Sequence, residues 1–144
     1  MIFNLHPMED SIFAKIIKGE ISAHRVYEDD DILAFLDAHP VNPGHTLVVP
    51  KKACRGLFDC DPAMLAKVIQ AVQKVAQAVK EATHADGINI QQNEGAAAGQ
   101  KVFHLHFHVI PRFENDGFQH WAGKSYPSEE VAKTIAETIK QRLS

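Results

Sequence analysis

The chain is poor in cysteine and has no long apolar run. Only Cys54 and Cys60 occur among its 144 residues, and they form no Cys-x-x-Cys pattern. Such sparse cysteine does not favour a disulfide framework and indicates a reducing compartment. No apolar run approaches the ~18 residues that a membrane helix needs. Residues 1–7 also lack the regions of a signal peptide, so we expect a cytoplasmic protein without a membrane partner.

The chain also lacks an excess of positive charge, with 15 Lys and Arg against 18 Asp and Glu. The formal net charge of −3 argues against broad electrostatic binding to nucleic acid, which usually requires a basic face. A content of 45% hydrophobic and 23% charged residues is typical of a globular protein. The length suits a single domain over residues 1–144, in which residues 1–9 are a loose leader and residues 128–144 form a last helix.

Sequence periodicity predicts an α+β fold. Apolar residues at helical spacing indicate a short helix over 11–18, a long helix that begins at Asp61-Pro62 and ends near 83–87, and a C-terminal helix capped by Ser128. Strand-like runs lie at 25–28, 32–36, 45–49, 87–93 and 104–112. Their short connections predict an antiparallel sheet with helices on one face and histidines on the other.

The last of these strands carries an unusual pattern. His104, His106 and His108 alternate with large apolar residues. Successive side chains of a strand point to opposite faces, so the three histidines would share one face. Three adjacent imidazoles are costly to desolvate on a core face. The pattern therefore predicts a functional site.

Three explanations fit this pattern. A His-x-His pair about 6.7 Å apart can bind one zinc ion, but further ligands would have to come from His39, His45, a carboxylate or a cysteine. A neutral imidazole can instead attack phosphorus while its neighbours bind phosphate oxygens or protonate the leaving group. Gly95 and Gly99 favour this chemistry, because their loop could bring backbone N–H groups to a phosphate. An edge strand with solvated histidines is the third explanation.

The segment His104–Ile110 resembles the signature of the histidine triad superfamily, whose three histidines alternate with apolar residues. Similar blocks occur at Asp10–Ile16, Phe35–Asp37, Pro43–Lys51 and Asn93–Gln100. The resemblance covers nearly the whole chain and is nearest to the bacterial nucleotide-binding branch. It implies a five-stranded antiparallel sheet with a short N-terminal, a long central and a C-terminal helix. It also implies a homodimer that joins two sheets.

The resemblance further implies a hydrolase or transferase that acts at the α-phosphate of a nucleotide. His106 would be the nucleophile and would form a nucleotidyl-histidine. His108 and His45 would hold phosphate oxygens, and His104 would orient the central ring. The residues implied in substrate binding are Asp37 for the ribose hydroxyls, Ile12, Phe13, Ile16 and Phe35 for the base, and Asn93, Gly99, Gln100 and Val102 for the phosphate and leaving group.

Several of these residues also have simpler structural explanations. Phe13, Ile16 and Phe35 would serve equally well in a hydrophobic core. Asp37 precedes a proline-rich loop and could be a turn residue, and Asn93 could cap a strand end.

The chain departs from its relatives at two places. Many relatives begin with Cys-Ile-Phe-Cys and bind zinc there with two histidines, whereas this chain has Ser11-Ile-Phe-Ala14. We therefore expect no metal and no cofactor, which leaves His45 and His104 to other roles. Relatives of the phosphoramidase type commonly carry Ser or Thr at the position of Lys101, which could bind a polyphosphate leaving group or face solvent.

The expected function is metal-independent hydrolysis of nucleoside 5′-phosphoramidates or related purine-nucleotide conjugates. Asn93 favours this branch, because relatives that hydrolyse diadenosine polyphosphates carry Gln there. Hydrolysis of dinucleoside polyphosphates by the same residues is the first alternative. The others are a purine-nucleotide-binding module that turns over little substrate while serving a partner, and a zinc protein.

Overall fold

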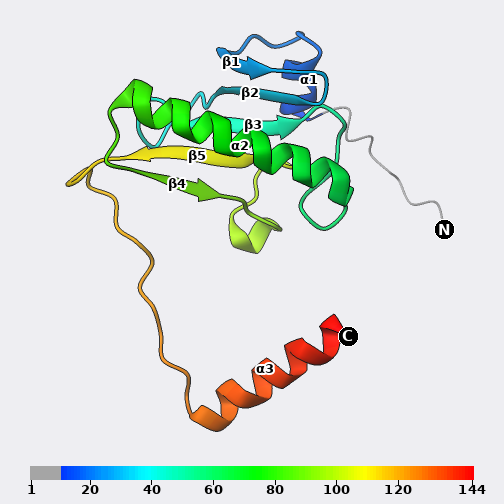
Figure 1. Ribbon diagram of the computed structural model, residues 1–144, viewed down its shortest axis with the longest axis vertical. Coiled ribbons are helices and arrows are strands. Elements are labelled where there is room, and N and C mark those ends of the chain that lie inside the picture. Colours follow the sequence, from blue (N-terminus) through cyan, green and yellow to red (C-terminus); the bar gives the residue numbers. More distant parts are fainter. Residues whose placement is uncertain (1–10) are drawn as a thin grey trace, which may run out of the picture.

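The computed structural model describes residues 11–144, so the predicted leader over residues 1–9 lies outside the described part. The chain forms a sheet and several helices in mixed order, which confirms the predicted α+β class (Figure 1). The elements are α1 (Ile12–Ile17), β1 (Arg25–Glu28), β2 (Ile32–Leu36), β3 (Thr46–Pro50), α2 (Pro62–Thr83), β4 (Gly87–Gln91), the short 3₁₀ helix η2 (Ala96–Ala98), β5 (Phe107–Arg112) and α3 (Glu129–Leu143).

The sheet has five strands in the order β1-β2-β3-β5-β4, and every neighbouring pair is antiparallel. Three acidic residues, Asp29, Asp30 and Asp31, form the turn between β1 and β2. The carboxylate of Asp29 accepts hydrogen bonds from the backbone N–H groups of Asp31 and Ile32, which closes the turn. β5 lies between β3 and β4, so the strand that carries His108 is in the interior of the sheet.

Helices cover both faces of the sheet. α2 packs on one face against Ile32, Ala34 and Val48. The alternate residues of the same strands point the other way, where Leu33 and Phe35 pack with α1. The expectation that the helices share one face is therefore wrong for α1, which lies on the histidine face. The reason is that the central strands are apolar on both faces, so both require cover.

The helix ends follow the local chemistry of the sequence. Ser11 caps α1 by accepting the N–H of Ala14 at 3.0 Å, and Asp61 caps α2 by accepting the N–H of Ala63 at 2.7 Å. Pro62 occupies the first turn of α2, where no N–H is needed. Capping thus fixes where α1 presents its side chains to the sheet.

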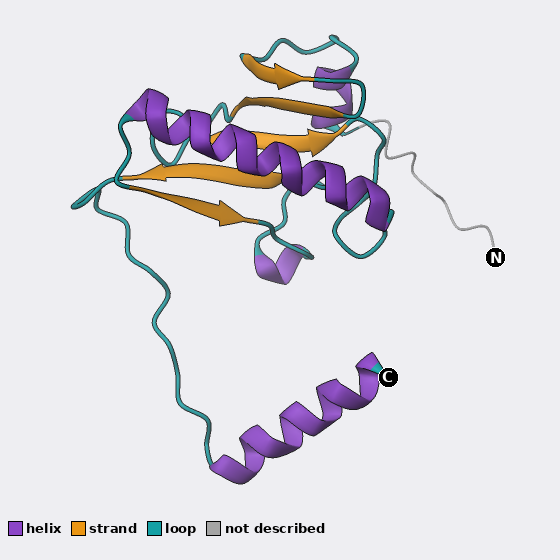
Figure 2. Ribbon diagram, in the orientation of Figure 1, coloured by secondary structure: helices purple, strands orange, loops and turns teal. Residues whose placement is uncertain are grey.

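The C-terminal part of the chain has a different character. Residues between β5 and α3 form an extended connection that crosses the end of β4 and leads away from the sheet (Figures 1 and 2). α3 begins after its predicted cap Ser128, and none of its residues is buried. Among residues 11–144, no helix is long and apolar enough to cross a membrane.

Candidate active site

His104 is the anchor of the histidine cluster. Its side chain is fully buried, and its Nε2 lies 2.8 Å from the carbonyl oxygen of Pro50. A carbonyl oxygen can only accept, so Nε2 carries the proton and Nδ1 is left as an acceptor. The hydroxyl of Ser11 lies 3.2 Å from Nδ1 and donates to it. Since Ser11 also caps α1, a single oxygen connects this helix to His104.

His106 has the geometry of a nucleophile. Its Nδ1 lies 2.7 Å from the carbonyl oxygen of His104 and donates to it. The opposite nitrogen, Nε2, therefore keeps its lone pair. Burial lowers the pKa of His106, against the opposing effect of that hydrogen bond, so the ring is neutral at neutral pH. The ring of Phe13 packs edge-on at 5.0 Å and holds its orientation.

His108 and His45 form a directed hydrogen-bond chain. The N–H of Val41 donates to Nδ1 of His45 at 3.0 Å, so the proton of His45 is on Nε2. That Nε2 lies 2.9 Å from Nδ1 of His108 and donates to it. His108 must then carry its own proton on Nε2, where it can be offered to a ligand. The ring of His108 lies 5.0 Å from that of His106.

All four histidines of this cluster are held neutral. Burial, with a further contribution from the neighbouring His106 and His45 rings, lowers the pKa of His108 to about 4. Burial also lowers the pKa of His45 and of His104 below the ordinary value of 6.5. The cluster therefore supplies lone pairs and N–H donors without bringing positive charge into the sheet.

The predicted strand over residues 104–112 is wrong at its start. β5 begins at Phe107, which pairs with Val48 of β3. Continuing this register would place residue 105 opposite Pro50, which has no N–H to extend the ladder. Instead, the N–H of Leu105 donates to the backbone carbonyl oxygen of Cys54, outside the sheet, at 2.8 Å. His104 and His106 thus lie in the irregular segment before the strand, and only His108 lies on it.

The fold brings Asp37 close to the histidines, whereas its predicted contact with ribose hydroxyls stays a prediction. Asp37 follows β2, and its Oδ2 lies 3.6 Å from Nε2 of His45. Its other oxygen accepts the N–H of His39 at 2.8 Å, so Asp37 also has the turn role that was the simpler alternative. The side chain is 20% exposed, which leaves a carboxylate edge for hydroxyl donors.

The apolar residues predicted to line a base pocket divide into two groups. Phe13, Ile16 and Phe35 belong to one buried cluster, and the first and last stack edge to face at 5.5 Å. These three therefore have the core role that was the alternative. Ile12 is half exposed and leaves apolar surface. Contact of any of these four with a base stays a prediction. Val102, which was predicted to contact the phosphate and leaving group, is partly buried against the same cluster, and that contact also stays a prediction.

The loop before the histidines is held by Gln100. Its side-chain carbonyl accepts the N–H of Gly95, and its amide donates to the carbonyls of Arg55 and Val102. Gln100 is buried, so it positions the loop. Gly99 has a φ of +96° that favours glycine, and the amide of Asn93 lies beside it. Lys101 follows and is exposed; its contact with a leaving group stays a prediction.

Two places in the described chain are candidates for a metal site. Ligand atoms of Asp37, His45 and His108 lie within 4.8 Å of one another. However, the Val41 N–H directs the lone pair of His45 away from this group, so a cation would have to displace a proton from Nε2. At the position of the relatives' cysteines, Ser11 is already bonded to His104, and Ala14 offers no ligand. The residues at neither place fit a resident zinc ion.

The sequence analysis did not predict the roles of three residues that contribute to this site. Val41 and Pro50 act through backbone groups, which no side-chain pattern reveals. Ser11 was recognised as the start of a helix, but not as a partner of His104. Its distance of 93 positions along the chain from that histidine explains the omission.

The model of the HIT domain family matches residues 18–115, a range that includes all four histidines. The chain is 50% identical to an uncharacterized HIT-like protein of Borreliella burgdorferi, over 94% of this chain and 100% of that protein. It is 41% identical to adenylylsulfatase HINT3 of Arabidopsis thaliana, over 81% of this chain and 58% of the plant protein. The crystal structure of SMU.412c from Streptococcus mutans shares 38% identity, covers 98% of this chain and 90% of its own, and superposes with a TM-score of 0.90. The chain belongs to the HIT family.

Proposed function

We propose that this protein hydrolyses nucleotide conjugates at the α-phosphate, with nucleoside 5′-phosphoramidates as the preferred class. The observation that carries this proposal is the fixed tautomer of His106. Its Nδ1–H is bonded to the carbonyl of His104, so a neutral Nε2 with a free lone pair is held in one orientation. A histidine with only a packing role does not require a free lone pair on Nε2 in a fixed orientation.

The reaction would run in two displacements. Nε2 of His106 attacks the α-phosphorus and forms an N–P bond, while the bond from phosphorus to the leaving nitrogen breaks. The amine departs with the electron pair of that bond and takes up a proton from solvent, and the water that attacks in the second step returns a proton to solvent. Water then attacks phosphorus, the N–P bond to His106 breaks, and the nucleoside monophosphate is released. The His104 carbonyl, which accepts the Nδ1–H, would stabilise the positive charge that the ring gains on attack.

The neighbouring groups would hold the nucleotide. His108 offers its Nε2–H to a phosphate oxygen, and His45 orients that donor through Nδ1 of His108. The partly exposed carboxylate of Asp37 would accept the ribose hydroxyls. Each of these roles uses a neutral donor or a single carboxylate, in keeping with the lowered pKa values of the histidines.

The known relatives support a nucleotide hydrolase. HINT3 is named an adenylylsulfatase, and adenylyl sulfate is a nucleotide joined to its leaving group at the α-phosphate. Hydrolysis of dinucleoside polyphosphates is the second candidate, favoured by the exposed Lys101 next to the loop. A lysine could bind the negative charge that such a leaving group carries.

The decisive experiment compares three substrates under identical conditions in the presence of EDTA. An AMP–amine conjugate, adenylyl sulfate and a diadenosine polyphosphate are assayed with the wild type and with His106→Ala. We expect turnover of all three to require His106, with the highest kcat/KM on the AMP–amine conjugate. The highest kcat/KM on the polyphosphate would favour the second candidate. Nucleotide binding with negligible turnover of every substrate would contradict a hydrolase.

We also propose that two copies pair along β4. In the described sheet β4 bonds to β5 on one side, and its other edge is free. Free edges are commonly covered or paired in stable proteins. Ile90 on this strand is 44% exposed, so a second copy would also cover apolar surface. Antiparallel pairing of the two β4 strands would continue the sheet through a two-fold axis.

A further inference from the structure

We propose that the C-terminal arm, defined as residues 113–143, is exchanged between two copies of this chain. α3 of one copy would fill an apolar groove on its partner, between α2 and the β1–β2 edge. This inference rests on the pairing along β4 proposed above. It does not depend on the proposed hydrolase chemistry, which uses no residue of the arm.

α3 has an apolar stripe without a partner. Val131, Ile135, Ile139 and Leu143 recur every four residues, so they share one side of the helix. All four are exposed in the described chain, from 38% for Val131 to 83% for Leu143. An isolated helix of 15 residues is only marginally stable in water. A stripe of this kind therefore indicates that α3 packs against something outside its own chain.

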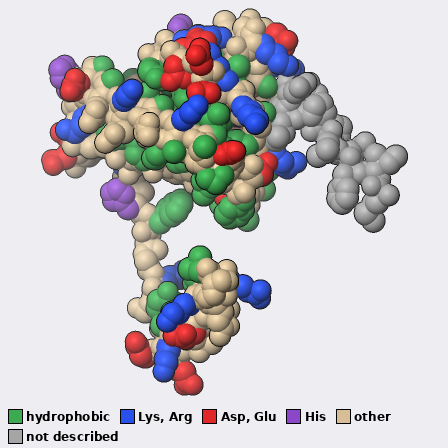
Figure 3. Space-filling model, turned by 45° about the vertical axis from the view of Figure 1, so that its right-hand side comes forward, with side chains coloured by type: hydrophobic (Ala, Val, Ile, Leu, Met, Phe, Trp, Pro, Cys, Tyr) green, Lys and Arg blue, Asp and Glu red, His purple; other side chains and the backbone are tan. Residues whose placement is uncertain are grey.

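The connection to α3 is also rich in exposed aromatic residues. Phe118, Trp121 and Tyr126 are 51%, 88% and 63% exposed. Contiguous exposed apolar surface commonly marks an interaction site in a soluble protein. The space-filling view shows the helix joined to the body only through this narrow connection (Figure 3). The aromatic residues and the α3 stripe thus extend along one arm.

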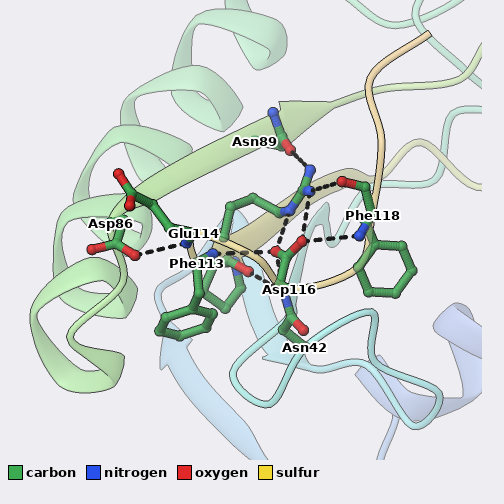
Figure 4. A network of polar contacts seen from close by, with 9 residues as sticks. Asn42, Asp86, Asn89, Phe113, Glu114, Asp116 and Phe118 are labelled. Carbon is green, nitrogen blue, oxygen red and sulfur yellow. Dashed lines mark hydrogen bonds and ion pairs between the residues drawn. The ribbon is translucent and has the colours of Figure 1, made fainter.

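The direction in which the arm leaves the body is fixed by a polar network. Arg112, at the end of β5, makes two hydrogen bonds to the carboxylate of Asp116, at 2.7 and 3.0 Å, and a third to Asn89 of β4 at 2.7 Å. Asn42 and the N–H of Phe118 also donate to Asp116 (Figure 4). Bidentate pairs of this kind define geometry as well as stability. The base of the arm is therefore held against β4 and β5, and the arm is directed past the β4 edge.

The body offers an apolar groove of about 400 Å³. It lies between the C-terminal half of α2 and the edge formed by β1 and β2. Val26, Leu36, Val75, Ala78 and Val79 line it, and Val26 is 50% exposed. A groove with aliphatic walls is suited to the aliphatic side chains of an amphipathic helix.

The fold places this groove where a second copy would present it to the arm. In Figure 1 the C-terminal end of α2 lies at the upper left, and α3 lies at the lower right, beyond β4. Antiparallel β4 pairing corresponds to a half-turn about an axis that is perpendicular to the sheet and passes beside the free edge of β4. This rotation would bring the groove of the second copy to the side of β4 on which α3 lies. The groove of a β4-paired copy would then face α3 of the first copy, and the reverse contact would form at the same time.

A solved relative has an arm with the same course. The structure of SMU.412c aligns with 98% of this chain at a TM-score of 0.90. An alignment of that extent includes the extended connection and most of α3. An arm that keeps its course away from its own sheet in a relative of 38% identity is consistent with a fixed docking site on another molecule.

The experiment uses Trp121, because it is the only tryptophan in the chain. Its emission reports burial of the arm, and analytical ultracentrifugation of the same full-length samples reports association. The arm variant is Ile135→Ser/Ile139→Ser, and the groove variant is Ala78→Arg, at an exposed position on α2. The matched control is Lys133→Ser/Glu137→Ser, on the opposite side of α3.

We expect the wild type and the control to be dimers whose Trp121 emission is at short wavelength and moves to longer wavelength on dilution. Both the arm and the groove variants should emit at long wavelength. Mixing these two variants should restore part of the short-wavelength emission, because the mixed dimer retains one intact arm and one intact groove. Docking within one chain could not be restored by mixing, since neither variant has both partners.

Three results would overturn the proposal, and they are distinguishable. A dimer in which Trp121 is exposed would reject the exchange and leave β4 pairing in place. A monomer with concentration-independent short-wavelength emission would show that the arm docks on its own chain. A monomer with exposed Trp121 would reject both the exchange and the pairing. None of these results bears on the proposed hydrolase, which only a catalytic assay can reject. Failure of the exchange and failure of the hydrolase are therefore distinguishable.

Discussion

The histidine cluster and the C-terminal arm are opposites within one chain. In the cluster, His104 and His106 are almost completely buried, and each ring donates a hydrogen bond to a backbone carbonyl of the same chain. In the arm, Trp121 and Ile139 are exposed, and no residue of α3 is buried. The cluster is complete within one chain, whereas the arm presents apolar surface that the body of its own chain does not cover.

This difference separates two kinds of function. A network of buried, directed hydrogen bonds fixes protonation and orientation, which is what a chemical step requires. An exposed apolar helix has no fixed contacts until it packs against another surface. Such a helix is typical of an element that joins molecules in an assembly. If the two functions are separate, the chemistry resides in the cluster alone, and substitutions there should change turnover.

The largest effect is expected at His106. His106→Ala should lower kcat/KM at least ~10³-fold, because the variant lacks the attacking nitrogen. The fold should be retained, since the ring bonds to one carbonyl only. Initial rates on the AMP–amine conjugate and circular dichroism measure the two quantities. His24→Ala, at an exposed histidine before β1, is the matched control. Near-wild-type turnover by folded His106→Ala would reject the nucleophile.

A smaller loss is expected when the hydrogen-bond chain is broken. His45→Ala removes the donor that fixes the proton of His108 on Nε2. We expect kcat/KM to fall about 10²-fold, the scale of one positioned proton donor. The variant should still form the covalent adduct, only more slowly. Rapid-quench kinetics would show this, and an unchanged rate of adduct formation would exclude the proposed role of His45.

The next effect is that of acid pH on kcat/KM, which depends on the lowered pKa values of the clustered histidines. Burial lowers the pKa of His108 to about 4, and protonation of this ring would break the hydrogen bond that it accepts from His45. We therefore expect kcat/KM to be constant from pH 8 to 6 and to fall as the pH approaches 4. An ordinary imidazole would already lose activity near pH 6.5. A midpoint at 6.5 would contradict the neutral cluster.

Stability should change in the same direction. The folded-state pKa of His108 is about 4, below its unfolded value of 6.5. The unfolded chain therefore binds more protons in this interval, and the free energy of unfolding should decrease as the pH falls from about 6.5 to about 4. Urea denaturation at pH 7, 5.5 and 4.5 measures this trend. His108→Asn should weaken it, and an equally steep trend in that variant would assign it to other groups.

The smallest effect is expected at Ser11. Ser11→Ala removes both the cap of α1 and the donor to His104. Loss of the cap should cost about 1 kcal/mol, and loss of the anchor should reduce kcat several-fold with little change in KM. Ser11→Thr, which keeps the hydroxyl, should restore both. If Ser11→Ala loses stability but keeps full kcat, the serine is a cap and nothing more.

Much of the fold could be predicted because it is encoded locally. Ser11, Asp61 and Ser128 mark the starts of the three α-helices through their own side chains. The placement of α1 was missed, although the unbroken apolar run 32–36 already indicated a strand that is buried on both faces. The start of β5 could not be predicted, because it depends on Pro50 from another strand.

The site could be predicted as a set of residues but not as a network. The alternation of three histidines identified where the chemistry resides. Which nitrogen carries each proton depends on Val41 and Pro50, whose contributions are backbone groups brought close by the fold. The buried position of Gln100 likewise depends on the path of the loop around it.

The most direct test of the central claim is mass spectrometry of protein quenched with acid-free denaturant during turnover of an AMP–amine conjugate. We predict one added nucleotidyl group, located by peptide sequencing on His106, that accumulates faster than it is lost in the first turnover. The adduct should be missing in His106→Ala. An adduct on another residue, or turnover with no adduct at any time, would contradict the account.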